Sequence, residues 1–373
     1  MKLLITGANG FIGKNLVLEL QNRGYNDLLF YEEHNSEKEL EWLIRQSSFI
    51  FHLAGVNRPK EAKEYVNGNV SLTEKIINIA TKSDNCATVI FTSSIQASLD
   101  NPYGKSKKEA EDIIIDYSKK TEAIVKIFRL ANVFGKWASP NYNSVVATFC
   151  YNIANELPIH IENKNSEINL VYIDDVVNSL INAMLNNYEA FPDERFYITP
   201  SYVTSVGALA KIIEDFREGR KILNIPNMGE GLIKKLYSTY LSYLPLDEFV
   251  YPLICKSNEH GGFTEVFKQE SFGQVSVNVI KPGVTKGNHW HHSKVEKFVV
   301  VSGDAIIRFR RVGEDISSGY IEYRVSSDIF KVVDIPPGYT HNITNIGNVD
   351  LVTVMWANEI YDSRRSDTYK LEV

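Results

Sequence analysis

The first half of the chain alternates short apolar runs with longer amphipathic stretches. The short runs have the length of β-strands, and the stretches between them repeat apolar residues at the three- and four-residue spacing of a helix. The pairs are 2–6 with 13–23, 28–31 with 37–45, 49–53 with 64–80, and 88–93 with 105–119. Each connection is too long for a hairpin and long enough for a crossover helix, which predicts a doubly wound parallel α/β sheet of the Rossmann type.

The second half has a different pattern. From about residue 263 onward the apolar runs are short, rich in β-branched and aromatic residues, and divided by Gly, Pro and Asn. The absence of a helical pattern between them predicts an all-β sandwich or barrel. A junction at 244–258, which carries Pro245 and Pro252, separates the two patterns. We therefore expect two domains, 1–245 and 246–373.

Composition limits the class of protein. The chain has 40 basic and 46 acidic residues and a net charge of −6, which argues against nucleic acid or an anionic membrane as a partner. Its apolar runs fall far short of the roughly 20 residues of a membrane span, and the run at the start is too short for a secretion signal. The widely spaced Cys86, Cys150 and Cys255 fit a reducing compartment. We expect a soluble, cytoplasmic protein.

A glycine-rich turn stands between the first predicted strand and the first predicted helix. It carries Gly7, Gly10 and Gly13 in the sequence TGANGFIG. Glycines at this spacing permit a tight turn, a close approach to a pyrophosphate and close packing of helix on strand, at a helix N-terminus that attracts phosphate. A turn without a ligand is the alternative. The strand-turn-helix context favours a dinucleotide site.

The residues leave the choice between NAD and NADP open. An acidic residue about 20 positions after such glycines binds the ribose 2′-hydroxyl of NAD, and Glu32 or Glu33 could serve. Lys14, next to the last glycine, could instead attract the 2′-phosphate of NADP. All three are equally compatible with plain surface charges.

A tyrosine and a lysine four residues apart follow the fourth predicted strand. Tyr103 and Lys107 share one helix face, so the ammonium can lower the pKa of the phenol from about 10 and make it a usable acid. Ser93 and Ser94 offer a hydroxyl that can hold a substrate carbonyl. A solvated helix face is the alternative, but the glycine turn in the same half favours catalysis.

Together these motifs resemble the extended short-chain dehydrogenase/reductases that act on nucleotide sugars. The matching segments are TGANGFIG, HLAG at 52–55, FTSS at 91–94, YGKSK at 103–107, RLANVFG at 129–135 and VYIDDVV at 171–177. The resemblance implies Tyr103 as proton donor, Lys107 as the group that tunes it, and Ser94 or Ser93 as carbonyl anchor, with Asn132 facing the sugar nucleotide. It also implies cofactor contacts from Gly7, Asn9, Gly10, Phe11, Ile12, Gly13, Leu53, Ala54, Tyr103 and Lys107.

The second half carries histidines and a glutamate at ligand spacing. His289 and His291 are two apart on a predicted strand and point to the same face, while Glu296 can return from the next strand. With His341 they offer three imidazoles and one carboxylate, a set that suits zinc, iron, nickel or manganese. Scattered surface or core histidines are the alternative. The spacing favours a metal site formed by His289, His291, Glu296 and His341.

This spacing resembles the two motifs of cupin barrels, GxxxxxHxHxxxxExxxxxxG and PxGxxHxxxN. A reductase joined to a cupin is similar to the bifunctional enzymes of capsular polysaccharide synthesis on the route to UDP-N-acetyl-L-fucosamine. The resemblance implies that the cupin epimerises C3 of UDP-2-acetamido-2,6-dideoxy-4-hexulose. The reductase would then reduce the C4 ketone to the L-talose product with NADPH, in preference to NADH. One divalent metal, zinc, and a homodimer are further expectations.

Two alternatives stay open. The cupin could only dimerise a single-activity reductase, or the chain could be a sugar-nucleotide sensor, against which the intact Ser94, Tyr103 and Lys107 weigh. The metal could polarise the ketone or only stiffen the barrel. For the epimerisation acid and base the candidates are Tyr339, Lys294 and His292.

Overall fold

The computed structural model describes residues 1–59, 61, 63–83, 87–186 and 195–373. Cys86 lies outside these ranges. The chain divides into two compact units, the first made of Met1–Glu214 and Lys235–Pro245, the second of Asp215–Lys234 and Leu246–Val373. Residues 215–234 thus group with the C-terminal unit. No helix in the described ranges is long and apolar enough to cross a membrane.

A five-stranded parallel sheet in the order β2-β1-β3-β4-β5 forms the centre of the first unit. Strands β1 and β3 are buried at every position because helices cover both faces. The strand order reverses beside β1, and in open α/β sheets ligands bind at the carboxyl ends of the strands at such a point. The strands are β1 (Leu3–Thr6), β2 (Leu28–Tyr31), β3 (Phe49–His52), β4 (Thr88–Ser94) and β5 (Val125–Leu130).

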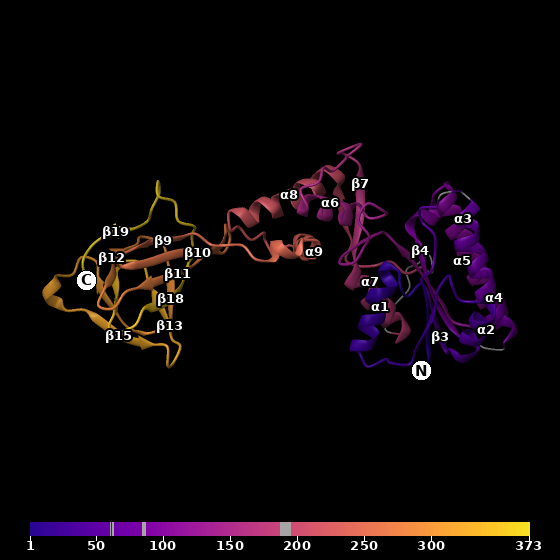
Figure 1. The fold of residues 1–373 in the computed structure, drawn as a ribbon, viewed down its shortest axis with the longest axis horizontal. Helices are drawn as coiled ribbons and strands as arrows, with labels where there is room; N and C mark the ends of the chain where they lie inside the picture. Colours follow the sequence, from indigo (N-terminus) through magenta and orange to yellow (C-terminus); the bar gives the residue numbers. More distant parts are fainter. Residues whose placement is uncertain (60, 62, 84–86, 187–194) are drawn as a thin grey trace. The chain divides into compact units, whose positions relative to one another are not determined.

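Helices on both faces bury the two sides of this sheet (Figure 1). Helices α1 (Phe11–Asn22) and α7 (Ile173–Met184) pack with Leu3 and Ile5, the side chains on one face of β1. Helices α2 (Glu37–Gln46), α4 (Leu72–Lys82) and α5 (Pro102–Thr121) pack with Leu4 on the other face. The predicted doubly wound α/β sheet is confirmed.

Shorter elements complete this part of the chain. A π-helical segment, Val66–Ser71, joins α3 (Lys63–Tyr65) to α4, where the sequence predicted one helix. A small sheet has the order β6-β7-β8. The other elements are η2 (Ile95–Ser98), β6 (Asn132–Phe134), α6 (Val145–Ala154), β7 (Glu167–Tyr172), β8 (Tyr202–Ser205), α8 (Val206–Lys221), α9 (Gly231–Leu241) and η3 (Leu246–Phe249).

Two antiparallel sheets make up most of the second unit, which confirms the predicted all-β half. One has the order β16-β13-β18-β11-β10-β9 and the other β15-β14-β17-β12-β19. Phe298 and Leu351 of the first sheet share a core with Ile307 and Ile343 of the second, so the sheets pack face to face. Strands begin at Cys255, earlier than the predicted residue 263.

The strands of the second unit are β9 (Cys255–Asn258), β10 (Gly261–Gln269), β11 (Gly273–Ile280), β12 (Thr285–Trp290), β13 (Glu296–Ser302), β14 (Asp304–Arg311), β15 (Ile321–Ser326), β16 (Val332–Ile335), β17 (Tyr339–Asn345), β18 (Leu351–Ala357) and β19 (Tyr369–Lys370). A short helical turn, η4 (Ile316–Ser318), lies between β14 and β15.

Candidate functional site

The glycine turn at the carboxyl end of β1 forms a tight cradle. Gly7 has φ +70°, and a Cβ there would lie 3.0 Å from the backbone of Ala54. A Cβ on Gly13 would lie 2.2 Å from the carbonyl oxygen of Gly7. The N-cap of α1 is Gly10, which has no side chain to accept from the first N–H groups of the helix. A ligand can accept from these groups instead. These residues fit the pyrophosphate of a dinucleotide.

Glu32 directly follows β2, and its side chain reaches the glycine turn that follows β1. Its carboxylate accepts a hydrogen bond of 2.8 Å from the backbone N–H of Asn9. Lys14 is exposed on α1, and Glu33 is exposed beside Glu32. The structure therefore selects Glu32, of the two acidic candidates, as the one that contacts the glycine turn.

His52 at the end of β3 is buried between two hydroxyl groups. Its Nδ1 lies 2.9 Å from Thr6 Oγ1, and its Nε2 lies 2.9 Å from Thr73 Oγ1. Burial, together with the charge of Lys107, lowers the pKa of His52 to about 3. The imidazole is thus neutral near pH 7 and ties β1, β3 and α4 together beneath the cradle.

Tyr103 and Lys107 occupy the start of α5, which Asn101 caps by accepting from the N–H of Gly104 at 2.8 Å. The ammonium of Lys107 donates to the carbonyl oxygen of Thr92 at 3.0 Å, and burial lowers its pKa to about 8. Burial raises the pKa of the Tyr103 phenol, and a hydrogen bond with Ser94 only partly opposes this. The pKa of Tyr103 is therefore raised, and not lowered as the sequence predicted, because burial outweighs the contact with Ser94.

The two candidate serines have different partners. Ser93 donates to Glu111 Oε1 at 2.6 Å. Glu111 is fully buried and also receives two hydrogen bonds from Arg129, at 2.9 and 2.8 Å. Burial raises the pKa of Glu111, but the hydrogen bonds from Arg129 and Ser93 outweigh it and hold the carboxyl ionised. The hydroxyl of Ser93 is therefore bound to the ion pair of Glu111 and Arg129, whereas Ser94 contacts Tyr103.

Asn132, expected to face the sugar, is exposed at the start of β6. Its side-chain amide donates to the backbone oxygen of Asn169 on β7 at 3.0 Å. The side chain therefore helps to join these two strands.

In the second unit, the four predicted metal ligands come together. One ligand atom from each of His289, His291, Glu296 and His341 lies within 4.8 Å of the others. Glu296 Oε2 is 3.5 Å from Nε2 of both His291 and His341. These three atoms are buried and have no hydrogen-bond partner within the described part of the chain. Buried donor atoms of this kind fit a divalent metal ion, because an ion would satisfy them all.

The ligands come from three segments of the two sheets. His289 lies on β12 opposite His341 on β17, and Glu296 begins β13. His291 lies one residue beyond the end of β12, where the sequence predicted a continuing strand. Burial and the neighbouring His341 lower the pKa of His289 to about 4, so its imidazole is neutral near pH 7. Burial raises the pKa of Glu296, but the close imidazoles of His291 and His341, each 3.5 Å from its carboxylate, outweigh burial and lower that pKa.

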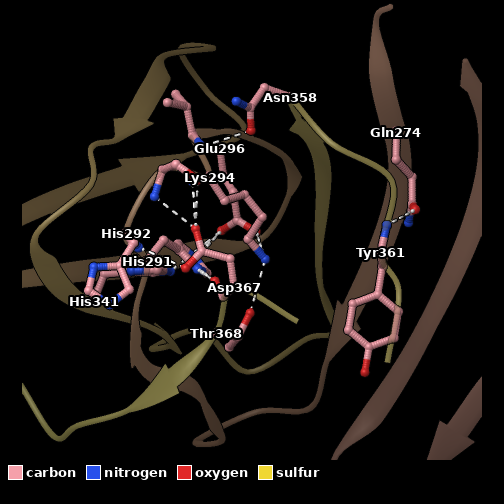
Figure 2. A network of polar contacts seen from close by, with 12 residues as sticks. Gln274, His291, His292, Lys294, Glu296, His341, Asn358, Tyr361, Asp367 and Thr368 are labelled. Carbon is pink, nitrogen blue, oxygen red and sulfur yellow. Dashed lines mark hydrogen bonds and ion pairs between the residues drawn. The ribbon is translucent and has the colours of Figure 1, made fainter. Parts of the chain in front are cut away.

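Asp367, near the end of the chain, is hydrogen-bonded to His291 and to the segment that follows it (Figure 2). Its backbone oxygen accepts from Nδ1 of His291 at 2.5 Å, which leaves Nε2 facing Glu296. Its carboxylate accepts from the backbone N–H groups of His292, Ser293 and Lys294 at 2.8–2.9 Å. These bonds outweigh the effect of burial and lower the pKa of Asp367. No spacing motif links Asp367 to His291, so the sequence did not predict this contact.

A cavity of about 480 Å³ opens onto the cluster. Three of the ligands, His289, Glu296 and His341, contribute to its lining, together with Lys286 and Lys294. Lys294 Nζ lies 3.3 Å from Glu296 Oε1. Of the candidates for acid and base, Lys294 alone lines this cavity. His292 instead packs its ring on Trp290 and Tyr369, and Tyr339 is absent from the lining.

Comparison with known proteins identifies both halves of the chain. Residues 3–198, more than half of the chain, match the NAD dependent epimerase/dehydratase family. Residues 256–369 match the polysaccharide biosynthesis C-terminal domain.

Full-length relatives match as well. The chain is 44% identical over 376 residues to a UDP-2-acetamido-2,6-beta-L-arabino-hexul-4-ose reductase of Pseudomonas aeruginosa, covering 100% of this chain and 99% of the relative. The crystal structure of the capsular polysaccharide assembling protein CapF from Staphylococcus aureus matches with a TM-score of 0.91 and 45% identity, with both chains covered completely.

A more distant structure shares the fold alone. A UDP-glucose 4-epimerase from Thermotoga maritima matches with a TM-score of 0.55 and 22% identity over 65% of this chain and 98% of its own. The chain therefore belongs to the NAD dependent epimerase/dehydratase family and carries a polysaccharide biosynthesis C-terminal domain behind it.

Proposed function

We propose that the chain is a bifunctional nucleotide-sugar enzyme of capsular polysaccharide synthesis. Its cupin-like second unit would epimerise C3 of UDP-2-acetamido-2,6-dideoxy-4-hexulose, and its first unit would reduce the C4 ketone to UDP-2-acetamido-2,6-dideoxy-L-talose. The observation that carries the reductase is the placing of Ser94, at the end of β4, beside Tyr103 on α5, with buried Lys107 one helical turn away. Full-length identity of 44% to a reductase of a UDP-4-keto sugar supports this substrate class.

In the reductase, each residue has a separate task. The glycine cradle at Gly7, Gly10 and Gly13 and the start of α1 bind the dinucleotide pyrophosphate. A bound nicotinamide cofactor supplies the hydride for C4. Ser94 holds the ketone oxygen by a hydrogen bond, and the phenol of Tyr103 gives that oxygen its proton. The raised pKa of Tyr103 keeps the phenol protonated before the reaction.

The cofactor of the proposal is NADPH, as the family resemblance implies. Glu32 opposes this choice, because a carboxylate next to the turn repels a 2′-phosphate and accepts from a 2′-hydroxyl. Glu32 is therefore the residue on which a choice between NADPH and NADH depends.

Epimerisation at C3 requires a base, an acid and a group that stabilises an enolate. The ketone at C4 acidifies the C3 hydrogen, so that a proton can leave and return on the other face. His289, His291, Glu296 and His341 would hold a divalent ion, which we propose to be zinc. As a Lewis acid the ion would stabilise negative charge on oxygen. The proposal extends to a homodimer and to a cytoplasmic location, with Cys150 and Cys255 as free thiols.

One experiment separates this proposal from a single-activity reductase with a structural second unit. The purified chain is incubated in heavy water with the UDP-4-keto sugar and without NADPH, and deuterium at C3 is read by mass spectrometry and NMR. We expect deuterium at C3, and formation of the talose product once NADPH is added. Tyr103→Phe is the control, since it should keep the exchange and lose the reduction. A wild-type chain that reduces the sugar without exchange would contradict the bifunctional proposal.

A further inference from the structure

A break in the alternation of β12 places a lysine beside the metal ligands. Lys286 and His289 are three residues apart, a spacing that puts side chains on opposite faces of a regular strand. The register against β17 shifts between Gly287 and His289, where Gly287 has φ +108° and Asn288 has φ +54°. Asn288 is the extra, unpaired residue of this bulge, and it puts the side chains of Lys286 and His289 on the same face of the strand.

The pairing with β17 confirms this common face. Lys286 lies opposite Ile343 and His289 lies opposite His341, and these two partners are themselves two residues apart. All four line the same cavity. A Cβ on Gly287 would lie 2.8 Å from the backbone of Asn342 and His341, so glycine is the residue that fits this bulge.

Lys286 differs from the other cavity lysines in its partners. Its Nζ donates to Asn278 Oδ1 at 2.9 Å and to the backbone oxygen of Val279 at 3.1 Å, both neutral acceptors. Lys294 instead faces the carboxylate of Glu296 at 3.3 Å. An ammonium has three hydrogens, and within the described ranges two of those on Lys286 are bound. The third can reach a ligand in the cavity.

The environment also makes Lys286 a stronger acid than a solvated lysine. Burial lowers its pKa, and Cys255 only partly opposes this. Lys256, which also lines the cavity, is by contrast exposed on the edge strand β9.

We infer that Lys286 is the catalytic acid that returns a proton to C3, on the face opposite to the base that removed one. The inference rests on the proposed epimerase. When the base takes the C3 hydrogen as a proton, the electron pair of that bond forms the C3–C4 double bond, and the carbonyl pair moves onto O4. An N–H bond of Lys286 then breaks, its proton bonds to C3, and the O4 pair re-forms the ketone. The neutral amine regains a proton from water through the open cavity, and the base releases the proton it took from C3 to water, which restores both groups.

The test uses the full chain with Lys286→Met, in heavy water and with the UDP-4-keto sugar. The base still removes the C3 proton and returns a deuteron on its own face, so we expect deuterium in the sugar of unchanged configuration. The inverted sugar, trapped by NADPH as the talose product, should fall by about 100-fold or more. Lys281→Met is the matched control, because Lys281 is exposed and paired with Asp350 at 2.8 Å. Bound metal and melting temperature report on folding.

A second variant separates proton transfer from charge. Lys286→Arg keeps the positive charge but holds its protons too firmly to give them up, so inversion should stay lost. Inversion at the wild-type rate in either variant would overturn the inference. A variant that binds metal but loses both deuterium exchange and inversion would also overturn the inference. Lys286 acts only when a proton returns to C3, so its loss should not prevent the base from removing the first proton. A wild-type chain without exchange would overturn the proposed epimerase and this role with it.

Discussion

At the scale of single residues, the proposed reductase site depends on which of two adjacent serines is free to contact a substrate. Ser93 and Ser94 stand side by side in sequence and both are buried. Adjacent residues on a strand point in different directions, so these two side chains contact different residues of α5. Ser93 meets Glu111, and Ser94 meets Tyr103.

This difference predicts opposite results for two alanine variants. Ser94→Ala removes the hydroxyl that we propose to hold the ketone, and we expect kcat/KM for reduction to fall about 100-fold. Ser93→Ala should retain the reductase and lower only stability, since Arg129 still satisfies Glu111. The measurement is NADPH oxidation with the keto sugar, with thermal unfolding alongside. Equal losses of activity in both variants would contradict the assignment of Ser94.

Cofactor choice is a second property of a single residue. Replacing the carboxylate in Glu32→Gln removes the repulsion of a 2′-phosphate, so the ratio of kcat/KM with NADPH to that with NADH should rise about tenfold. Glu33→Gln is the matched control, because Glu33 is an exposed neighbour. A ratio that changes equally in both variants would mean that general surface charge, and not Glu32, decides.

The pKa of Lys107 predicts how reduction depends on pH. Its pKa is lowered to about 8, so the ammonium form, which we propose to support proton donation by Tyr103, is lost as pH rises through about 8. We expect kcat/KM for reduction to decrease above this pH. Lys107→Arg retains the charge at higher pH, and its activity, although lower, should no longer decrease near pH 8. An unchanged profile in Lys107→Arg would assign the decrease to another group.

At the scale of elements, the segment around β19 holds the proposed metal ligands in place. Strand β19 pairs with β12 beside His289, and Asp367 just before it holds both His291 and the backbone of 292–294. This stabilising contact therefore comes from far along the sequence, because His291 and Asp367 are 76 residues apart.

This arrangement predicts a change in metal affinity without a change in ligands. Asp367→Ala removes the carboxylate that orders the 292–294 turn, and we expect the affinity for the ion to fall about 10–100-fold. Asp362→Asn, in the same C-terminal segment but bonded to Arg364, is the control. Zinc retained after dialysis against a graded series of chelator concentrations gives the measurement. Equal retention by Asp367→Ala and wild type would show that the turn holds without Asp367.

At the scale of the whole molecule, each unit has its own core, and the metal cluster belongs to the second. Removal of the ion would leave the buried atoms of His291, Glu296 and His341 unsatisfied, which destabilises that unit. Binding at an ion concentration about 100 times Kd stabilises by about 2.7 kcal/mol. Chelation should therefore lower the melting temperature of the second unit by roughly 5–10 °C.

The same chelation separates a catalytic ion from a structural one. Melting is followed by calorimetry, with Tyr103→Phe as a control that should show the same shift. If the ion is catalytic, deuterium exchange at C3 is lost at temperatures where the apo-protein is still folded. If it is structural, exchange survives until unfolding. An unchanged melting temperature on chelation would contradict the metal site itself.

Sequence by itself determined what local spacing encodes. The glycines at 7, 10 and 13, the four-residue step from Tyr103 to Lys107, and the ligand types of the second half each follow from a short period or a fixed turn. The alternation of strand and helix likewise determined the α/β first half, and short β-branched runs determined the antiparallel second half. These features depend on neighbours in the chain, which the sequence displays directly.

Only the tertiary structure decided how distant residues share a site. It gave Ser93, but not Ser94, a hydrogen bond to Glu111. It also brought the carboxylate of Glu32 to the N–H of Asn9, and the backbone oxygen of Asp367 to the ring of His291. The bulge at Gly287 turned Lys286 into the cavity of the metal ligands, against the alternation that its spacing from His289 predicts. Sheet pairing and burial set these contacts, and neither leaves a period in the sequence, because each partner is fixed by the fold rather than by its neighbours.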